Sequence, residues 1–399
     1  MNHAESRLHY PLGESLPASG CAIDVAPGIK WIRMGLPFAL DHINLWLLRD
    51  NVDGPQGPVD GWTVVDCCVD IPAARAQWEA VFDSALEGLP IVRVIATHMH
   101  PDHLGLAHWL CERWNAPLWI SATDYYTALA ASTGTLFPST EALSDFYRSH
   151  GLSDAEFHAR LKDRGSYYPA LVPKLPMRFH RLMDGDRIRI GGHDFECIAG
   201  YGHAPEHIAL HCAARGVLIS GDMVLPRIST NISVFAGEPE ADPLKLFLTS
   251  LTRFDSLADS TLVLPSHGKP FIGLAERLRQ LHAHHQEHLT VARSACMERA
   301  QSAGELLPRL FRRELDTQQL SFALGEALAH LHLLWHEGVV NRVCEPDGVY
   351  RFSTTSSPLI YSLQAATERR PDPVVAAQTI PRDICSQCAH TPVTSHRRK

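Results

Sequence analysis

Short apolar runs alternate along this chain with segments whose apolar residues recur at helical spacing. Apolar, β-branched runs bounded by glycine, proline or polar residues indicate strands, whereas the wider spacing indicates helices with one buried face. The pattern predicts strands at 43–48, 62–66, 91–96, 118–120, 187–190, 195–199, 208–212, 217–220 and 261–265, and helices at 73–86, 242–257 and 273–300. This interleaving of strands and helices favours a layered α/β fold.

The pattern also predicts how the chain is divided. Residues 1–272 carry the strands, and the helical stretches within 121–175 interrupt them, which predicts an inserted helical cap. The helix at 273–301 then connects to a smaller unit at 302–355. Residues 356–399 hold few large apolar side chains, so we expect a disordered tail there.

One polar cluster directly follows the strand predicted at 91–96. His98, His100, Asp102 and His103 lie within six positions, at a predicted strand-to-helix corner from which one helix begins near His103. Neutral imidazole and carboxylate groups are ligands for zinc and similar divalent ions. Four such groups exceed the needs of one open catalytic site, so the cluster suggests two metal ions.

Three later residues repeat the pattern of a metal-binding side chain near the end of a predicted strand. They are His203, Asp222 and His267, and each has a glycine beside it. Open α/β sheets build their sites where strands meet loops, and glycine allows the backbone to approach closely. Each residue alone is a weak indication, but their shared context makes them candidate ligands.

Together with Asp66, these residues resemble the ordered motif residues of the metallo-β-lactamase superfamily, over roughly residues 20–272. The resemblance implies a four-layer αββα sandwich with the site at one edge of two facing sheets. It implies two divalent metal ions, with zinc as the expected metal, and Asp66 as a residue that orients a ligand without binding metal. The implied ligands are His98, His100 and His203 for one ion, Asp102, His103 and His267 for the other, and Asp222 as the bridge.

Departures from the family pattern narrow the expected activity. Members that hydrolyse β-lactams with a zinc-binding cysteine place it where this chain has Asp222, and none of the ten cysteines falls at a ligand position. The pattern instead resembles the hydrolase branch of glyoxalase II, lactonases and nucleases. Residues 324–352 resemble the small winged-helix domain of one β-lactamase-like group, some of whose members cleave RNA.

The implied activity is hydrolysis by a metal-bound hydroxide, with Asp102 as the catalytic residue that handles the proton. The expected substrate is a small ester, thioester or lactone. Two alternatives stay open: an endoribonuclease of the β-lactamase-like group, and a non-catalytic metal-binding protein.

Charge and composition limit the partners. The net charge is −8, with 45% hydrophobic and 20% charged residues, which is typical of a soluble globular protein and gives no general attraction to nucleic acid or membrane. Residues 305–352 contain five arginines and seven acidic residues, so packing or homodimer formation is favoured over nucleic-acid binding. The N-terminus lacks the apolar core of a signal peptide and the cysteines are scattered, so we expect a cytoplasmic protein with reduced thiols.

Weaker candidates lie outside this ligand set. His207 is expected to orient a ligand or to serve a structural role in a strand. Arg227 would meet a substrate anion, although a surface role is favoured, and Tyr167 and Tyr168 would line the pocket from the cap, although packing is favoured.

Four further histidines share the predicted helix at 273–300: His282, His284, His285 and His288. Their spacing suits metal binding, but we expect them to form a solvated helix face.

Overall fold

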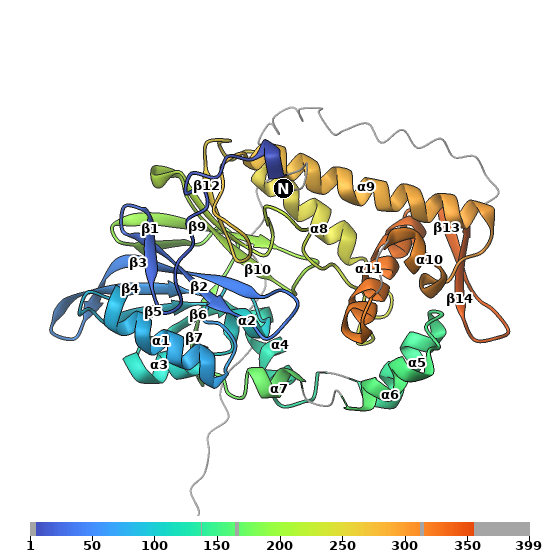
Figure 1. Ribbon diagram of the computed structural model, residues 1–399, viewed down its shortest axis with the longest axis horizontal. Coiled ribbons are helices and arrows are strands. Elements are labelled where there is room, and N and C mark those ends of the chain that lie inside the picture. Colours follow the sequence, from blue (N-terminus) through green and yellow to red (C-terminus); the bar gives the residue numbers. More distant parts are fainter. Residues whose placement is uncertain (1–4, 137, 164–166, 312–314, 355–399) are drawn as a thin grey trace, which may run out of the picture. The chain divides into compact units, whose positions relative to one another are not determined.

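Two facing sheets form the centre of the protein in a computed structural model that describes residues 5–136, 138–163, 167–311 and 315–354 (Figure 1). The first sheet has the order β1 (Ala22–Ala26), β2 (Ile29–Gly35), β3 (His42–Gly54), β4 (Gly57–Val65), β5 (Ile91–Ile95), β6 (Leu118–Ser121) and β7 (Phe179–Leu182). The second has the order β12 (Leu262–Pro265), β11 (Val217–Gly221), β10 (His207–Cys212), β9 (His193–Gly200) and β8 (Arg187–Ile190).

Helices cover the outer faces of both sheets (Figure 1). The helices up to the second sheet are α1 (Pro72–Ala85), α2 (Pro101–Leu104), α3 (Ala107–Trp114), α4 (Ala122–Ser132), α5 (Thr140–Ser149), α6 (Ala155–Asp163) and α7 (Tyr167–Leu171). The later elements are α8 (Pro243–Leu251), α9 (Leu274–Glu298), α10 (Ala303–Leu310), α11 (Thr317–His336) and the hairpin of β13 (Val340–Cys344) and β14 (Tyr350–Thr354). No helix in the described ranges combines the length and apolarity needed to cross a membrane.

Successive side chains along each strand alternate between the inner and the outer layer of the sandwich. In β3, Leu45 and Leu47 pack against the α1 side of the first sheet, whereas Trp46 points into the apolar cluster between the sheets. In β11, Ile219 enters that same inner cluster and Leu218 faces α8. Because successive strand side chains point to opposite faces, each sheet buries both of its faces. The predicted αββα sandwich is therefore confirmed.

The helix predicted to begin near His103 is broken in two. The helix α2 begins at Pro101 and ends at Leu104. Gly105 and Leu106 are not helical, and α3 follows them. The backbone N–H of Leu106 donates to the carbonyl oxygen of Cys68, and a Cβ at Gly105 would lie 2.7 Å from backbone atoms of neighbouring segments. This close backbone contact requires glycine and sets the position of the short helix that carries Asp102 and His103.

The insertion at 121–175 divides between two parts of the molecule. In α4 and α7, Tyr125 and Leu171 pack with the first sheet. Phe157 of α6 instead belongs to the apolar cluster of α8, α9, α10 and α11, and the backbone N–H of Gly304 donates to the carbonyl oxygen of His150. The domain boundaries and the winged-helix assignment stay predictions, and the predicted tail at 356–399 lies outside the described residues.

Candidate metal centre

The seven predicted ligands converge at one edge of the two sheets. His98 and His100 lie in the loop after β5, and α2 carries the next two ligands in its first turn. Three further loops bring the remaining ligands, after β9, β11 and β12. Segments up to 169 residues apart in sequence therefore meet at one site; they carry His98, His100, Asp102, His103, His203, Asp222 and His267.

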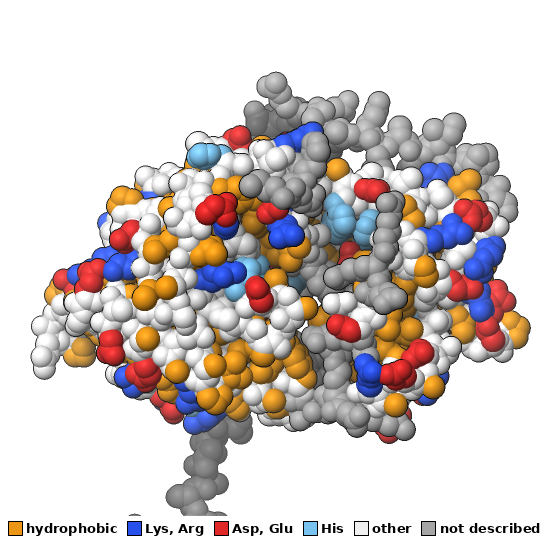
Figure 2. Space-filling view, in the orientation of Figure 1, with side chains coloured by type: hydrophobic (Ala, Val, Ile, Leu, Met, Phe, Trp, Pro, Cys, Tyr) orange, Lys and Arg blue, Asp and Glu red, His pale blue; other side chains and the backbone are white. Residues whose placement is uncertain are grey.

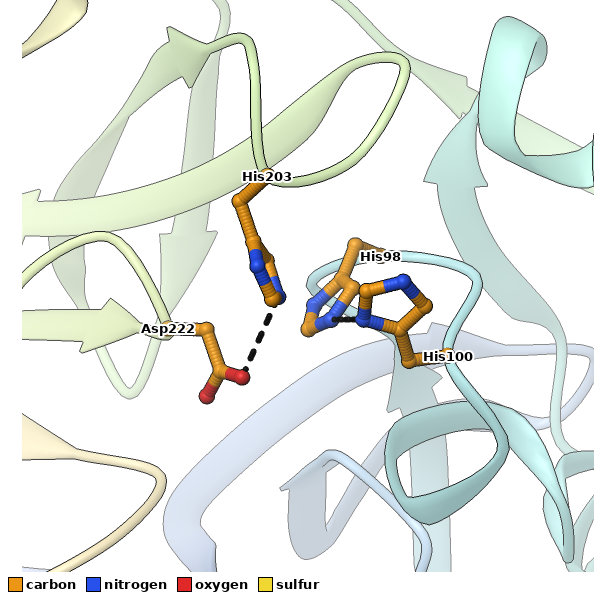
Figure 3. A group of neighbouring side chains, drawn as sticks. All are labelled: His98, His100, His203 and Asp222. Carbon is orange, nitrogen blue, oxygen red and sulfur yellow. Dashed lines mark hydrogen bonds and ion pairs between the residues drawn. The ribbon is translucent and has the colours of Figure 1, made fainter. Parts of the chain in front are cut away.

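The first group contains His98, His100, His203 and Asp222, whose candidate ligand atoms all lie within 4.8 Å of one another (Figure 3). The Nε2 atom of His98 is 2.9 Å from Nδ1 of His100. On the opposite side, Nε2 of His203 lies 3.2 Å from Oδ2 of Asp222. Three imidazoles and a carboxylate thus point toward a common centre.

The second group contains Asp102, His103 and His267, and Asp222 reaches it too. The Nε2 atom of His267 lies 3.4 Å from Oδ2 of Asp102. The other carboxylate oxygen of Asp222, Oδ1, lies 3.5 Å from Nε2 of His103 and 3.4 Å from Nε2 of His267. The two oxygens of Asp222 therefore face different groups, as a bridging carboxylate requires.

Unpaired buried atoms test whether metal ions fit this centre. Four of the candidate ligand atoms are buried and have no hydrogen-bond partner among the described residues: Nε2 of His103, His203 and His267, and Oδ1 of Asp222. Buried polar atoms are normally paired, so a cluster of unpaired ligand atoms needs a physical reason. Divalent ions bonded at about 2.0–2.2 Å would satisfy all four atoms. The donor set fits two such ions.

Protonation equilibria suit metal binding at several of the predicted ligands. Burial lowers the pKa of His100 to about 3 and that of His98 well below its usual range. For Asp102, burial would raise the pKa, but the attraction of the neighbouring His103 and His267 rings outweighs it and lowers the pKa to about 2. The free lone pairs of His98 and His100 and the ionised carboxylate of Asp102 are the forms that bind metal. For His103 and His267 burial would lower the pKa, but the neighbouring aspartates outweigh it and raise the pKa, so an ion would have to displace a proton from these two rings.

Asp66 lies just behind the second group and holds His103. Its Oδ2 is 2.8 Å from Nδ1 of His103, and its Oδ1 accepts a hydrogen bond from the backbone N–H of Thr97. A partner on the far nitrogen fixes the ring and turns Nε2 toward a metal. His207, buried at the start of β10, accepts a hydrogen bond at Nε2 from the backbone N–H of Asp222. Both positions suit residues that orient ligands without binding metal.

Several orienting residues escape sequence reasoning. The carbonyl oxygen of His42 is 2.7 Å from Nδ1 of His267, and Asn44 donates to the carbonyl oxygens of Pro265 and Gly268. These two residues of β3 fix the loop after β12, although more than 220 positions separate the partners. The sequence did not point to this role, because a polar residue inside a strand can serve many purposes and its distant partner cannot be identified from local pattern.

Asp124 of α4 joins two ligand loops. Its Oδ1 accepts a hydrogen bond from the backbone N–H of Met99, and its Oδ2 accepts one from the backbone N–H of Glu206. Met99 lies between two ligands, and Glu206 follows His203 in its loop. Burial raises the pKa of Asp124 to about 6.

The three weaker substrate candidates take different positions. The hydroxyl of Tyr168 is buried and donates to the carbonyl oxygen of Met99, so this side chain supports the ligand loop. Tyr167 is exposed and contacts Phe38. Arg227 is largely exposed, with an ion pair of 3.9 Å to Glu5. Binding of a substrate by any of them stays a prediction.

Comparison with known proteins identifies the family. Residues 41–267, which contain all seven predicted ligands, match the metallo-beta-lactamase superfamily, and residues 289–355 match the metallo-beta-lactamase-like, C-terminal domain. The chain belongs to the metallo-β-lactamase superfamily. Members of this superfamily typically bind two metal ions, in agreement with the two ligand groups.

Individual relatives agree with this assignment. A Bacillus subtilis protein described as the probable metallo-hydrolase YqjP is 23% identical over 345 residues, which cover 80% of this chain and 96% of that protein. A β-lactamase domain protein from Burkholderia ambifaria has a crystal structure with a TM-score of 0.83 and 51% identity, covering 89% of this chain and all of that one. A metallo-β-lactamase family protein from Thermus thermophilus has a TM-score of 0.65 and 28% identity, covering 83% of this chain and all of that one.

Proposed function

We propose that this protein is a dinuclear metal-dependent hydrolase that acts on a small ester, thioester or lactone. The observation that carries the proposal is the position of Asp222: its Oδ2 faces the unpaired Nε2 of His203, and its Oδ1 faces the unpaired Nε2 atoms of His103 and His267. One shared carboxylate would hold two cations close together. Such paired sites serve hydrolysis by activating the attacking water and by stabilising the charge that develops on the acceptor oxygen and the leaving group.

The cations, when bound, would lower the pKa of a water toward 7 and stabilise negative charge on the acceptor oxygen. The protein's own contribution is to hold the ligands and balance their charge. Asp102 and Asp222 supply two negative charges against the four positive charges of two divalent ions, so the site keeps a net positive charge. The carboxylate of Asp102 could also receive a proton from the attacking water. An electropositive site of this kind favours oxyanions.

A thioester is our first choice of substrate within this class. Two hydroxyacylglutathione hydrolases, from Xanthomonas axonopodis and Cereibacter sphaeroides, are 31% identical to this chain over 138 and 94 residues. These matches span 50% and 34% of the two proteins, so the support is local. It agrees with the resemblance of the ligand pattern to the glyoxalase II branch, and with the aspartate at position 222, where some β-lactam-hydrolysing members have a metal-binding cysteine.

RNA is a weaker candidate substrate, because the arginines of the C-terminal hairpin have other partners. Arg342 pairs with Glu240 and lies over the ring of Trp335, at 3.9 Å from its centroid. Arg351 pairs with Asp347. Phosphate binding would have to compete with these contacts.

The test combines metal analysis with a hydrolysis screen on the full chain. We expect at least two divalent ions per chain and metal-dependent cleavage of a short acyl thioester or a lactone. Asp222→Ala should lose both ions of the centre and the activity, whereas the matched control Asp60→Asn, which changes a carboxylate of the β3–β4 hairpin, should keep both. Cleavage of RNA alone would replace the proposal by the endoribonuclease. Metal binding without hydrolysis of any of these substrates would favour the non-catalytic alternative.

A further inference from the structure

The histidines of α9 do not form the solvated face that their sequence predicts. His285 is fully buried, and its ring packs edge-on against Phe247 of α8. His284 and His288 are partly buried beside it, with ring centroids 4.3 Å apart. The prediction was wrong because α11 packs along this side of α9 and covers it.

A chain of hydrogen bonds occupies two of the buried rings. Nδ1 of His330 in α11 donates to the carbonyl oxygen of Glu326, which leaves its Nε2 free to accept. Nδ1 of His285 lies 3.2 Å from that Nε2 and donates to it, and Nε2 of His285 then accepts from the hydroxyl of Ser229 at 3.1 Å. Both rings are thereby fully paired as neutral imidazoles. Neither is available to bind a ligand.

The other two rings face a carboxylate from α11. His284 and His288 are four positions apart and therefore share one side of the helix. Glu326 faces them, with Oε1 3.9 Å from Nδ1 of His288, and candidate ligand atoms of all three residues lie within 4.8 Å of one another. Nδ1 of His288 is buried and has no hydrogen-bond partner among the described residues. The side chains of His288 and Glu326 keep 13% and 16% of their surface exposed, so an ion could reach them. Figure 2 shows histidine side chains at the surface of the molecule.

We propose that His284, His288 and Glu326 form a third divalent-metal site, separate from the two ion positions at the sheet edge. Two imidazoles and one carboxylate are a zinc-type ligand set that leaves a fourth position for water. Tetrahedral bonds of about 2.1 Å separate ligand atoms by about 3.4 Å, so modest side-chain rotations would close the site. The ion would join α9 to α11.

The local charge balance supports a cation at this position. Burial raises the pKa of Glu326 to about 7, and burial together with His284 lowers the pKa of His288 to about 4. The carboxyl group therefore faces neutral rings that give it little positive charge. A divalent ion would supply that charge and use the imidazole lone pairs.

The experiment counts metal ions in the untagged full chain after stripping and reconstitution with Zn²⁺, and repeats the titration with Co²⁺ to follow its visible spectrum. We expect three ions per wild-type chain. His288→Ala and Glu326→Gln should each bind two, with hydrolysis retained. His282→Ala is the matched control, because this histidine shares α9 but not the site; it should bind three. Asp222→Ala should keep one ion, the one held by α9 and α11.

Two results would overturn the third site. One is a wild-type chain that binds only two ions while Asp222→Ala binds none. The other is His288→Ala and Glu326→Gln both retaining the wild-type number of ions. Failure of the hydrolase proposal gives a different pattern, namely ions bound at full number without activity. If His288→Ala does not fold, Glu326→Gln decides, since it conserves size and shape.

Discussion

Two histidine clusters in this protein use the same residue types in different ways. At the sheet edge, the second nitrogen of each of His103, His203 and His267 faces an oxygen from another segment. At the α9–α11 contact, two histidines instead pair with each other and with Ser229, and His284 and His288 remain beside Glu326. The first arrangement fixes ring orientation before any ion binds. In the second arrangement, the side chains of His284, His288 and Glu326 would still have to rotate when an ion binds. We therefore expect the sheet-edge centre to bind its ions more tightly.

The largest effect should come from removing a ligand of the sheet-edge centre. His98→Ala takes away a buried imidazole whose Nε2 faces the first group. We expect kcat/KM for the thioester or lactone to fall about 10³-fold, equivalent to about 4 kcal/mol of lost transition-state stabilisation. Steady-state kinetics with elemental analysis measures this. Unchanged kinetics in the metal-loaded variant would show that this cluster is not the active site.

Asp124, which joins the loops that carry His98, His100 and His203, should make the free energy of unfolding depend on pH. Its pKa in the folded protein is about 6, above the ordinary value of 3.8, so the folded state retains a proton that the unfolded state releases. This contribution to stability is present below pH 4 and is lost as the pH rises through 6, by about 3 kcal/mol. Asp124→Asn should remove that part of the pH dependence of unfolding. Urea titrations of both proteins from pH 4 to 7 provide the comparison; parallel curves would contradict the assignment.

Asp66→Asn tests whether a fixed ring orientation distinguishes the sheet-edge cluster from the α9–α11 cluster. The amide keeps the shape of the side chain but weakens the charged contact with Nδ1 of His103. Loss of such an orienting partner typically costs about 10–100-fold in metal affinity or activity. Competition with a chelator and steady-state kinetics should report the loss, with Asp60→Asn as the control. Equal behaviour of the two variants would mean that Asp66 does not orient the metal ligand.

Ser229→Ala should have the smallest effect. Ser229 contacts His285 in the α9–α11 cluster, and its neighbour Thr230 contacts His203 in the sheet-edge cluster, so these two residues connect the clusters. The substitution removes the hydroxyl that His285 accepts from, while the neighbouring Thr230 still contacts Nδ1 of His203. We expect a loss of about 1 kcal/mol in the free energy of unfolding and less than about a threefold change in activity. Chemical denaturation and kinetics together measure it. A large loss of activity with little change in stability would reveal strong coupling between the two clusters.

The sequence by itself determined the layered fold and pointed to the residues that gather at the sheet edge as candidate ligands. The alternation of apolar and polar residues along a strand assigns each side chain to one face of the sheet. The predicted ligands follow the ends of several strands, and in a layered α/β fold such strand ends meet at one edge of the sheets. The close spacing of His98, His100, Asp102 and His103 made the cluster visible in one short segment.

Only the tertiary structure decided which distant groups complete each cluster. Asn44, Asp124 and the carbonyl of His42 act on loops far away in sequence, through contacts that no local pattern records. The buried side of α9 likewise depends on α11, because a histidine-rich helix is solvated unless another helix covers it. Local periodicity predicts elements, but pairing between elements decides which polar atoms lose water and must find a partner.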